Sequence, residues 1–237
     1  MHRHTCGLGA VLLGSLLSGL LVACGSESPE SPPPQVSEPQ PPEPVAVTQP
    51  TLKPLPGKEG AAPSLTSITT VLLETTSGDI RIQIYPEAAP NAAQRFVELV
   101  ESGFYDDTPI SRVVPGFVAQ FGVNWREPHK AWQNRHFNDD PTLFALARGT
   151  LAFAKAGPNT NSTQVFINYT ENNRLADPQY NFTVFGEVVS GMDAVDQFVR
   201  VGDPQGGLSQ PRLWNDGAAY LESLDVKPTM ITHASVL

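Results

Sequence analysis

The chain offers few of the residue groups that usually carry out chemistry. Glu127, His129 and His136 supply a carboxylate and two imidazoles close together in the sequence, and zinc accepts both donor types. No second motif completes a four-ligand site, so we predict no metal. Ser111 lacks a suitably placed His–Asp pair that would activate it as a nucleophile. The sequence therefore points away from metal-assisted and nucleophilic catalysis, and we expect no cofactor.

A polar, turn-rich stretch runs from Gly157 to Asn168 with the sequence GPNTNSTQVFIN. Its first seven residues are Gly, Pro, Asn, Ser and Thr, which favour turns. The β-branched and aromatic residues behind them predict a short buried strand, Gln164 to Ile167. Scaffolds often present binding residues on a polar loop that is held by such a strand.

The overall composition narrows the class of protein. The chain has 237 residues, of which 40% are hydrophobic, and this is enough for one globular domain with additional segments. The formal net charge of −9 leaves no excess positive charge to neutralise phosphates. Nucleic-acid binding is therefore disfavoured, and the acidic surface mainly favours solubility.

The first 23 residues have the organisation of an export signal. A basic start, Met1 to His4, precedes an apolar run from Leu8 to Val22 that is short for a membrane span. The run ends in Leu-Val-Ala-Cys-Gly, which resembles the lipobox of bacterial lipoproteins and implies cleavage before Cys24 and lipidation of that residue. An ordinary secretory signal with an incidental cysteine is the alternative. Gly25 after the cysteine favours the outer membrane in cells that have two membranes.

Residues 24–64 read as the lipidated cysteine and a disordered linker. Twelve of the 23 prolines lie between Gly25 and Ser64. Extended proline-rich chain rises about 3.1 Å per residue, so this segment can reach on the order of 100 Å from a membrane. A proline-rich ligand for a partner module is the alternative. Cys6 leaves with the signal and Cys24 carries lipid, so the exported domain has no thiol for a disulfide.

Residues 65–237 form the predicted globular domain, which is rich in strands. The expected strands are Ile68–Glu74, Ile80–Tyr85, Val113–Phe121, Thr150–Ala154, Gln164–Ile167, Thr183–Val189 and Thr229–Val236. One helix is expected over Ala92–Ser102, with Asn91 as its N-cap and Gly103 at its end. A second, short helix is expected near Met192–Val199, followed by a long loop. Many strands with few helices predict a closed barrel or a sandwich.

Three separated motifs share a family resemblance. They are FYDDTPISRVVPGFVAQFG from Phe104 to Gly122, GTLAFAKAGPNTNSTQVFIN from Gly149 to Asn168, and FTVFGEVVSGMDAVD from Phe182 to Asp196. In residues and in spacing the segment from Ile68 to Phe198 resembles the cyclophilin-type peptidyl-prolyl isomerases. The resemblance implies an all-β fold, an eight-stranded antiparallel closed β-barrel capped by two α-helices. It also implies an enzyme that binds proline-containing peptides or unfolded segments.

The resemblance assigns residues to a peptide groove. It implies that Arg112 and Gln120 are catalytic, with the arginine donating a hydrogen bond that favours the twisted amide. The substrate-binding residues that it implies are Phe117, Val118, Ala154, Lys155, Gln164, Phe166, Leu175 and Phe182. The turn from Gly157 to Thr163 would then shape the rim of the groove, with Gln164 and Phe166 pointing inward from the strand behind it.

The chain departs from the family pattern in the segment Val123 to Arg148, which is shorter than in eukaryotic members and resembles bacterial exported ones, and at three smaller places. Ile110-Ser111 stands where many members have Phe-His, which we expect to change contacts at the groove wall. Lys155 replaces an asparagine and adds a positive charge, and Arg174 stands where many eukaryotic members have tryptophan. These differences affect the expected substrate preference more than the expected fold.

We therefore expect a peptidyl-prolyl cis-trans isomerase that assists the folding of envelope or secreted proteins. It would act as a monomer, lipid-anchored to the cell envelope at the periplasmic face, and would not bind nucleic acid. A peptide-binding chaperone or scaffold that keeps the groove but catalyses weakly is the alternative.

Overall fold

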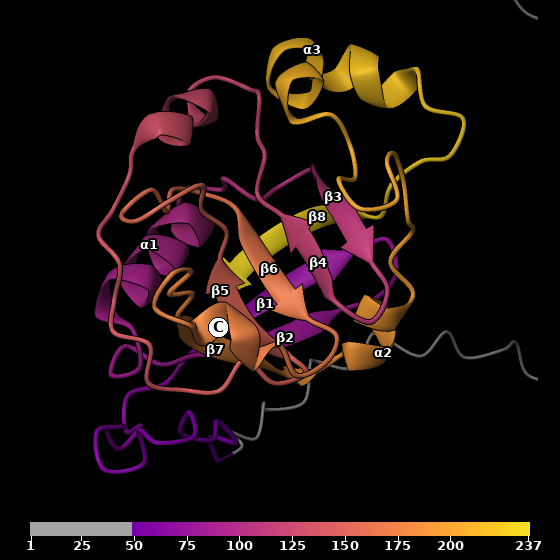
Figure 1. The fold of residues 1–237 in the computed structure, drawn as a ribbon. Coiled ribbons are helices and arrows are strands. Elements are labelled where there is room, and N and C mark those ends of the chain that lie inside the picture. Colours follow the sequence, from indigo (N-terminus) through magenta and orange to yellow (C-terminus); the bar gives the residue numbers. More distant parts are fainter. Residues whose placement is uncertain (1–48) are drawn as a thin grey trace, which may run out of the picture. The chain divides into compact units, whose positions relative to one another are not determined.

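Residues 49–237 are described by a computed structural model and belong to one compact unit. The predicted signal and the predicted lipidation site, Cys24, lie outside the described residues. The strands are β1 (Thr69–Thr75), β2 (Ile80–Ile84), β3 (Thr108–Val114), β4 (Val118–Phe121), β5 (Thr150–Phe153), β6 (Val165–Asn168), β7 (Val184–Ser190) and β8 (Met230–Val236). They close into a barrel in the order β1-β2-β7-β5-β6-β4-β3-β8, in which the paired strands are antiparallel (Figure 1). The predicted eight-stranded closed barrel is confirmed.

Side chains alternate between the two faces of the barrel wall, as the period of a strand requires. In β6, Val165 and Ile167 pack into a core to which every strand contributes, so this core fills the barrel interior. Phe166, between them, belongs instead to a second apolar cluster that also contains Val118 and Val184. This second cluster lies on the outer face of the wall, where the candidate site is found.

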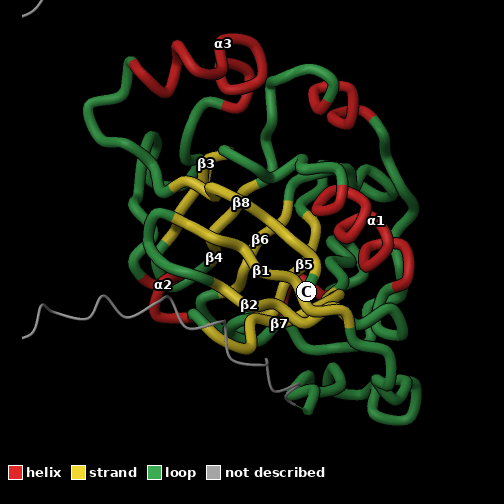
Figure 2. The backbone as a smooth tube through the Cα atoms, turned by 180° about the vertical axis from the view of Figure 1, so that it is seen from behind, coloured by secondary structure: helices red, strands yellow, loops and turns green. Residues whose placement is uncertain are grey.

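The helices lie outside the barrel. They are α1 (Pro90–Glu101), α2 (Met192–Asp196) and α3 (Gln210–Glu222), with short 3₁₀ helices η1 (His129–Asn134) and η2 (Asn173–Ala176). Helix α1 packs against β7 and β8, and α2 packs against β2 (Figure 2). No helix between residues 49 and 237 is long and apolar enough to cross a membrane.

Helix α1 matches the prediction along its length but not at its start. Phe96, Leu99 and Val100 are buried on one face, as expected. The predicted N-cap, Asn91, is wrong, because Pro90 already lies in the first turn and Ala89 occupies the cap position without a side-chain hydrogen bond. The carboxylate of Asp140 performs this role from a distant loop and accepts hydrogen bonds from the backbone N–H groups of Asn91 and Ala92, at 3.2 and 2.9 Å.

The predicted strand Val113–Phe121 is two strands. A turn at Pro115 and Gly116 separates β3 from β4, and the N–H of Phe117 donates to the carbonyl of Val114 at 3.0 Å. Gly116 has a φ of +71°, a conformation that glycine adopts at little cost. The resulting hairpin places the two halves of one sequence motif side by side.

Helix α3 falls where a long loop was expected, so that expectation is wrong for residues 210–222. Two residues obscure the helical pattern, since Pro211 lies in the first turn and Gly217 has the non-helical angles φ +45° and ψ −113°. Proline is tolerated at this position because the first N–H groups of a helix have no partner within it. Leu213, Trp214 and Tyr220 are nevertheless buried, and this burial attaches the helix to the domain.

The segment before β1 contacts the barrel. The backbone N–H of Thr51 donates to the Glu187 carboxylate at 2.7 Å, and the N–H of Leu55 donates to the carbonyl of Leu143 at 2.8 Å. These contacts extend the domain N-terminally to Thr51, beyond the predicted start at Leu65. A proline-rich composition does not prevent this, because an extended chain can still hydrogen-bond through its remaining N–H and carbonyl groups.

Candidate active site

An apolar hollow of about 200 Å³ opens on the outer face of the barrel wall. Its lining residues are Arg112, Phe117, Val118, Gln120, Ala154, Lys155, Phe166, Leu175 and Phe182. The rings of Phe166 and Phe182 meet edge to face with their centroids 5.5 Å apart. Nine of the ten predicted groove residues therefore surround one small hollow whose wall is aromatic and aliphatic, a shape suited to a proline ring.

A β-bulge sets the direction of Arg112. The register between β3 and β4 shifts between Ile110 and Arg112, so Ser111 has no partner, while Arg112 lies opposite Gln120. Ser111 is fully buried, and its hydroxyl donates to the carbonyl of Gln120 at 3.2 Å. Both Ile110 and Ser111 are buried and neither lines the hollow, so the structure does not show the change at the groove wall that was expected from these two residues.

Arg112 is held by two acceptors at the edge of the hollow. Its Nη1 donates to Oε1 of Gln120 at 3.2 Å, and its Nε donates to the backbone carbonyl of Gln205 at 2.5 Å. Gln120 in turn donates through Nε2 to Oε1 of Gln164 at 2.9 Å. Burial lowers the pKa of the Arg112 guanidinium, which nevertheless stays cationic at neutral pH because arginine is strongly basic.

Gln164 and Phe166 face the groove side of the wall, as expected, because the alternate residues Val165 and Ile167 pack into the interior of the barrel. Gln164 does not line the apolar hollow. It lines a larger neighbouring cavity and joins the site through Gln120.

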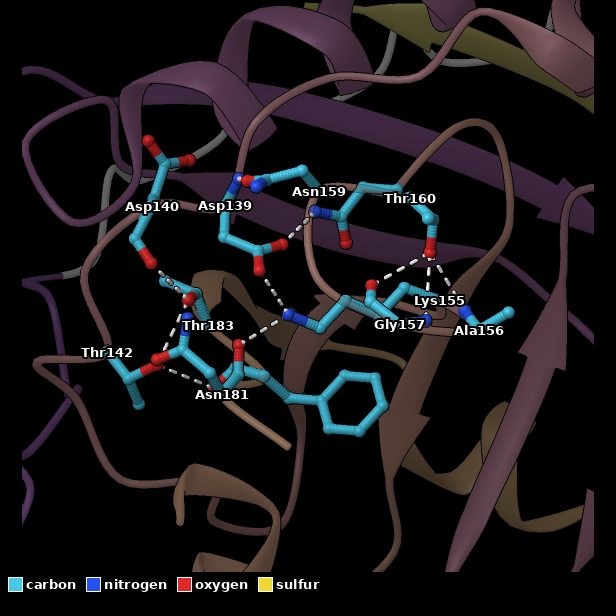
Figure 3. Close-up of polar contacts among 12 residues, drawn as sticks. Asp139, Asp140, Thr142, Lys155, Ala156, Gly157, Asn159, Thr160, Asn181 and Thr183 are labelled. Atoms are coloured by element: carbon cyan, nitrogen blue, oxygen red, sulfur yellow. Dashed lines mark hydrogen bonds and ion pairs between the residues drawn. The ribbon is translucent and has the colours of Figure 1, made fainter. Parts of the chain in front are cut away.

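Lys155 is buried in an ion pair beneath the groove. Its Nζ donates to Asp139 at 2.7 Å and to the carbonyl of Asn181 at 3.0 Å (Figure 3). The two charged side chains are only 4% and 14% exposed. Burial raises the pKa of Asp139, but hydrogen bonds from Lys155, the backbone of Asn159 and the amide of Asn161 outweigh burial and hold it below its usual range. The predicted extra positive charge of Lys155 is therefore neutralised by an acidic neighbour.

Arg174 lies next to the hollow, where it contacts the ring of Phe117. Its guanidinium carbon is 5.1 Å from the ring centroid of Phe117, and the guanidinium carbon of Arg112 is 5.7 Å from the same centroid. Arg174 is exposed and forms no ion pair within residues 49–237. The edge of the hollow therefore presents unneutralised positive charge.

The polar turn identified in the sequence borders the second cavity, of about 620 Å³. The hydroxyl of Thr160 braces this turn by accepting from the N–H groups of Ala156 and Gly157 at 3.1 and 3.0 Å (Figure 3). Thr160 and Ser162 line the cavity together with Gln120, Ala154 and Lys155, which also line the hollow. The two spaces are therefore adjacent, and the turn forms part of the rim of the larger one.

Two residues near the site were missed in the sequence, namely Gln205 and Gln210. Gln205 contributes only a backbone carbonyl, which no side-chain pattern could indicate. Gln210 donates through Nε2 to Oε1 of Gln164 at 3.1 Å from the first turn of α3. A prediction of α3 as a helix would have placed Gln210 in its first turn and marked it as a candidate.

The three residues considered as metal ligands do not converge. In residues 49–237 no three His, Cys, Asp or Glu side chains are arranged to hold a metal ion. His129 lies edge to face with Phe104 at a centroid distance of 5.9 Å. Its role in this structure is packing against the core.

The fold and the hollow together define a β-barrel with a peptide-sized groove on its outer wall. Residues 70–212 match the family described as cyclophilin type peptidyl-prolyl cis-trans isomerase/CLD. The chain therefore belongs to the cyclophilin family, and its activity is peptidyl-prolyl cis-trans isomerisation.

Curated relatives and solved structures agree with this assignment. The chain is 38% identical over 135 residues to peptidyl-prolyl cis-trans isomerase-like 3 of Rhizopus delemar, and the aligned region covers 52% of this chain and 77% of that protein. It is 36% identical over 148 residues to a peptidyl-prolyl cis-trans isomerase of Acinetobacter baylyi, which covers 60% and 78% respectively. A crystal structure of a cyclophilin type isomerase from Cryptosporidium parvum has the same fold, with a TM-score of 0.54 at 20% identity over 72% of this chain and 98% of that chain.

Proposed function

We propose that this isomerase accelerates rotation about X-Pro bonds in envelope or secreted proteins while they fold, with Arg112 as the catalytic donor. Rotation about a peptide bond is slow because the nitrogen lone pair is delocalised into the carbonyl, which creates a barrier of about 18–20 kcal/mol. At X-Pro both isomers are populated, yet they exchange only over tens to hundreds of seconds. A catalyst needs to stabilise the twisted state, in which the proline nitrogen becomes pyramidal and accepts a hydrogen bond.

One observation supports this role best, namely the fixed position of Arg112 at the edge of the apolar hollow. With the proline ring among Phe117, Phe166 and Phe182, the guanidinium lies on the polar side of the same hollow. Because Gln120 and the carbonyl of Gln205 already hold it, little reorganisation is required when the amide twists. The groove requires no nucleophile and no proton transfer for this reaction.

Two assays test the proposal at different levels. Cis-to-trans conversion of a short X-Pro peptide measures the activity, and refolding of a secreted protein whose slow phase is X-Pro isomerisation tests the proposed client class. We expect the wild-type protein to accelerate both, and an Arg112→Ala variant to accelerate neither. Strong peptide binding without acceleration would favour the scaffold alternative.

We also propose that the mature protein is a monomer anchored to the envelope membrane through lipid on Cys24. The lipobox-like end of the apolar run and the proline-rich segment behind it support this proposal. Each buried methylene of an acyl chain contributes about 0.8 kcal/mol to membrane binding. A Cys24→Ser variant should appear in the soluble fraction or remain uncleaved. A Cys24→Ser protein that is processed normally and stays on the membrane would show that the anchor lies elsewhere.

A further inference from the structure

Helix α3 is firmly attached beside the groove. Leu213 and Trp214 are buried, and Gly217 lies so close to the Trp125 ring that an added Cβ would approach it to 2.1 Å. The hydroxyl of Tyr220 accepts a hydrogen bond from the N–H of Ser209 at 3.0 Å, which ties the end of the helix to its start. In Figure 1, α3 lies beyond the ends of β3 and β8, outside the barrel.

The turn before α3 contacts the base of Arg112. Gly207 has a φ of +73°, and a Cβ at this position would meet the backbone oxygen of Ser111 at 2.4 Å and the Cβ of Arg112 at 2.6 Å. Asp203 braces the turn by accepting from the N–H groups of Gln205 and Gly206 at 2.9 and 2.6 Å. This close approach is what allows the carbonyl of Gln205 to reach Arg112.

The first turn of α3 forms one wall of the larger cavity. Gln210, Pro211, Trp214 and Asn215 line it together with Gln164. Of these wall residues, Gln210 is connected to Arg112 by hydrogen bonds, which run from Gln210 to Gln164, to Gln120 and then to Arg112.

In the hydrogen bonds that link Gln210, Gln164, Gln120 and Arg112, each donor and acceptor is defined. Oε1 of Gln164 accepts from both Gln210 and Gln120, so the amide oxygen of Gln120 is left to face Arg112. If the amide of Gln164 were flipped, its NH₂ group would face the NH₂ groups of Gln120 and Gln210. To accept from Gln164, Gln120 would then have to flip as well, which would turn its NH₂ group toward the guanidinium. The orientation of Gln120 that suits Arg112 therefore depends on donors that reach Gln164.

Only the donor function of Gln210 takes part in this arrangement. Its Oε1 is buried and has no hydrogen-bond partner among the described residues, whereas its Nε2 bonds to Gln164. We propose that Gln210 is a positioning residue, which orients Arg112 for catalysis by donating a hydrogen bond to Gln164 and thereby fixing the direction of the Gln120 amide. The proposal rests on the catalytic role of Arg112.

Three substitutions at Gln210 separate donation from packing. Gln210→Met keeps the length but has no polar group, Gln210→Glu can only accept, and Gln210→Lys can only donate. The full-length protein is assayed by NMR line-shape analysis of the cis and trans signals of an X-Pro peptide, which yields kcat and KM. Thermal melting checks the fold of each variant, and Gln197→Met on the exposed surface after α2 serves as a matched control.

We expect kcat to follow the ability to donate. Loss of one hydrogen bond lowers kcat of Gln210→Met by about 2- to 10-fold. Gln210→Glu falls at least as far, because its carboxylate faces the oxygen of Gln164. Gln210→Lys and the Gln197→Met control stay within about twofold of the wild type, and KM changes little in all four variants.

The opposite pattern would overturn the proposal. If Gln210→Lys loses as much kcat as Gln210→Met while both remain folded, or if all variants match the wild type, Gln210 does not act by donation. A change confined to KM would assign it to peptide binding instead. Arg112→Ala in the same assay distinguishes this failure from failure of the catalytic assignment, because that variant must lose turnover for any positioning effect on Arg112 to exist.

Discussion

Replacing Arg112 by alanine is the most direct test of the mechanism. A guanidinium carries five N–H donors, of which the structure uses two, one to Gln120 and one to the carbonyl of Gln205. The remaining donors have no partner among residues 49–237 and can reach the substrate. Removing one preorganised donor costs about 10²–10³ in rate, or about 2.7–4 kcal/mol of transition-state stabilisation. We expect Arg112→Ala to lower kcat/KM by this factor while peptide affinity changes far less, because the donor acts mainly in the twisted state.

The folded state should survive this change. The two hydrogen bonds contribute about 0.5–1.5 kcal/mol each, and both Arg112 and Gln120 are only partly buried. We therefore expect a loss of about 1–3 kcal/mol, which lowers the melting temperature by several degrees.

The assay measures turnover on an X-Pro peptide, peptide binding and thermal melting for the wild type and the variant. Arg112→Lys is the matched control, because it keeps the charge but loses the rigid fork of donors, and we expect intermediate turnover. A folded Arg112→Ala protein that retains most of its turnover would refute the assignment and leave a peptide-binding module.

Two further predictions concern the charges around the groove. Lys155→Met leaves the buried carboxylate of Asp139 without its cation, so we expect a loss of about 3 kcal/mol of stability at pH 7, measured by chemical denaturation. The folded-state pKa of Asp139 is depressed, so the ion pair stabilises the protein above the ordinary pKa near 3.8, and this stabilisation is lost as the pH falls through the folded-state pKa. The difference in stability between wild type and variant should therefore narrow below about pH 4. A difference that stays constant would contradict this. Arg174→Gln should lower kcat/KM about two- to threefold for a peptide with glutamate beside the proline and leave it unchanged for the same peptide with glutamine there, because Arg174 contacts the ring of Phe117 and has no ion-pair partner within residues 49–237. The effect should shrink at high salt, and equal losses on both peptides would argue against a charge effect.

The strand-rich class of the fold could be predicted because its signals are local, whereas the closed eight-stranded barrel and the groove residues were predicted from the family resemblance. Period-2 runs of β-branched residues, such as Ile80 to Ile84, place alternate side chains on opposite faces whatever their surroundings. Gly103 has a positive φ angle that other residues rarely adopt, so it marked the end of α1 directly, whereas the same signal at Gly116 was overlooked in the predicted strand Val113–Phe121. The motifs around Arg112 and Gln164 resemble a known family in spacing, and the structure brings these residues together at one groove.

Other features depend on partners that are distant in sequence. Helix α1 is capped by Asp140, which lies in a loop 48 residues after Ala92, so no local sequence motif could predict this cap. The bulge at Ser111 appears only when β3 is paired with β4, because a register shift is a property of two strands.

Helix α3 is the clearest case of a feature that only the tertiary structure decided. Pro211 and Gly217 weaken its local helical signal, and the helix is retained because Leu213, Trp214 and Tyr220 find buried sites against the domain. Its docking then brings Gln210 to Gln164 across 46 positions of sequence. Local sequence specifies which conformations each segment prefers, whereas burial and hydrogen bonding between distant segments decide which side chains meet.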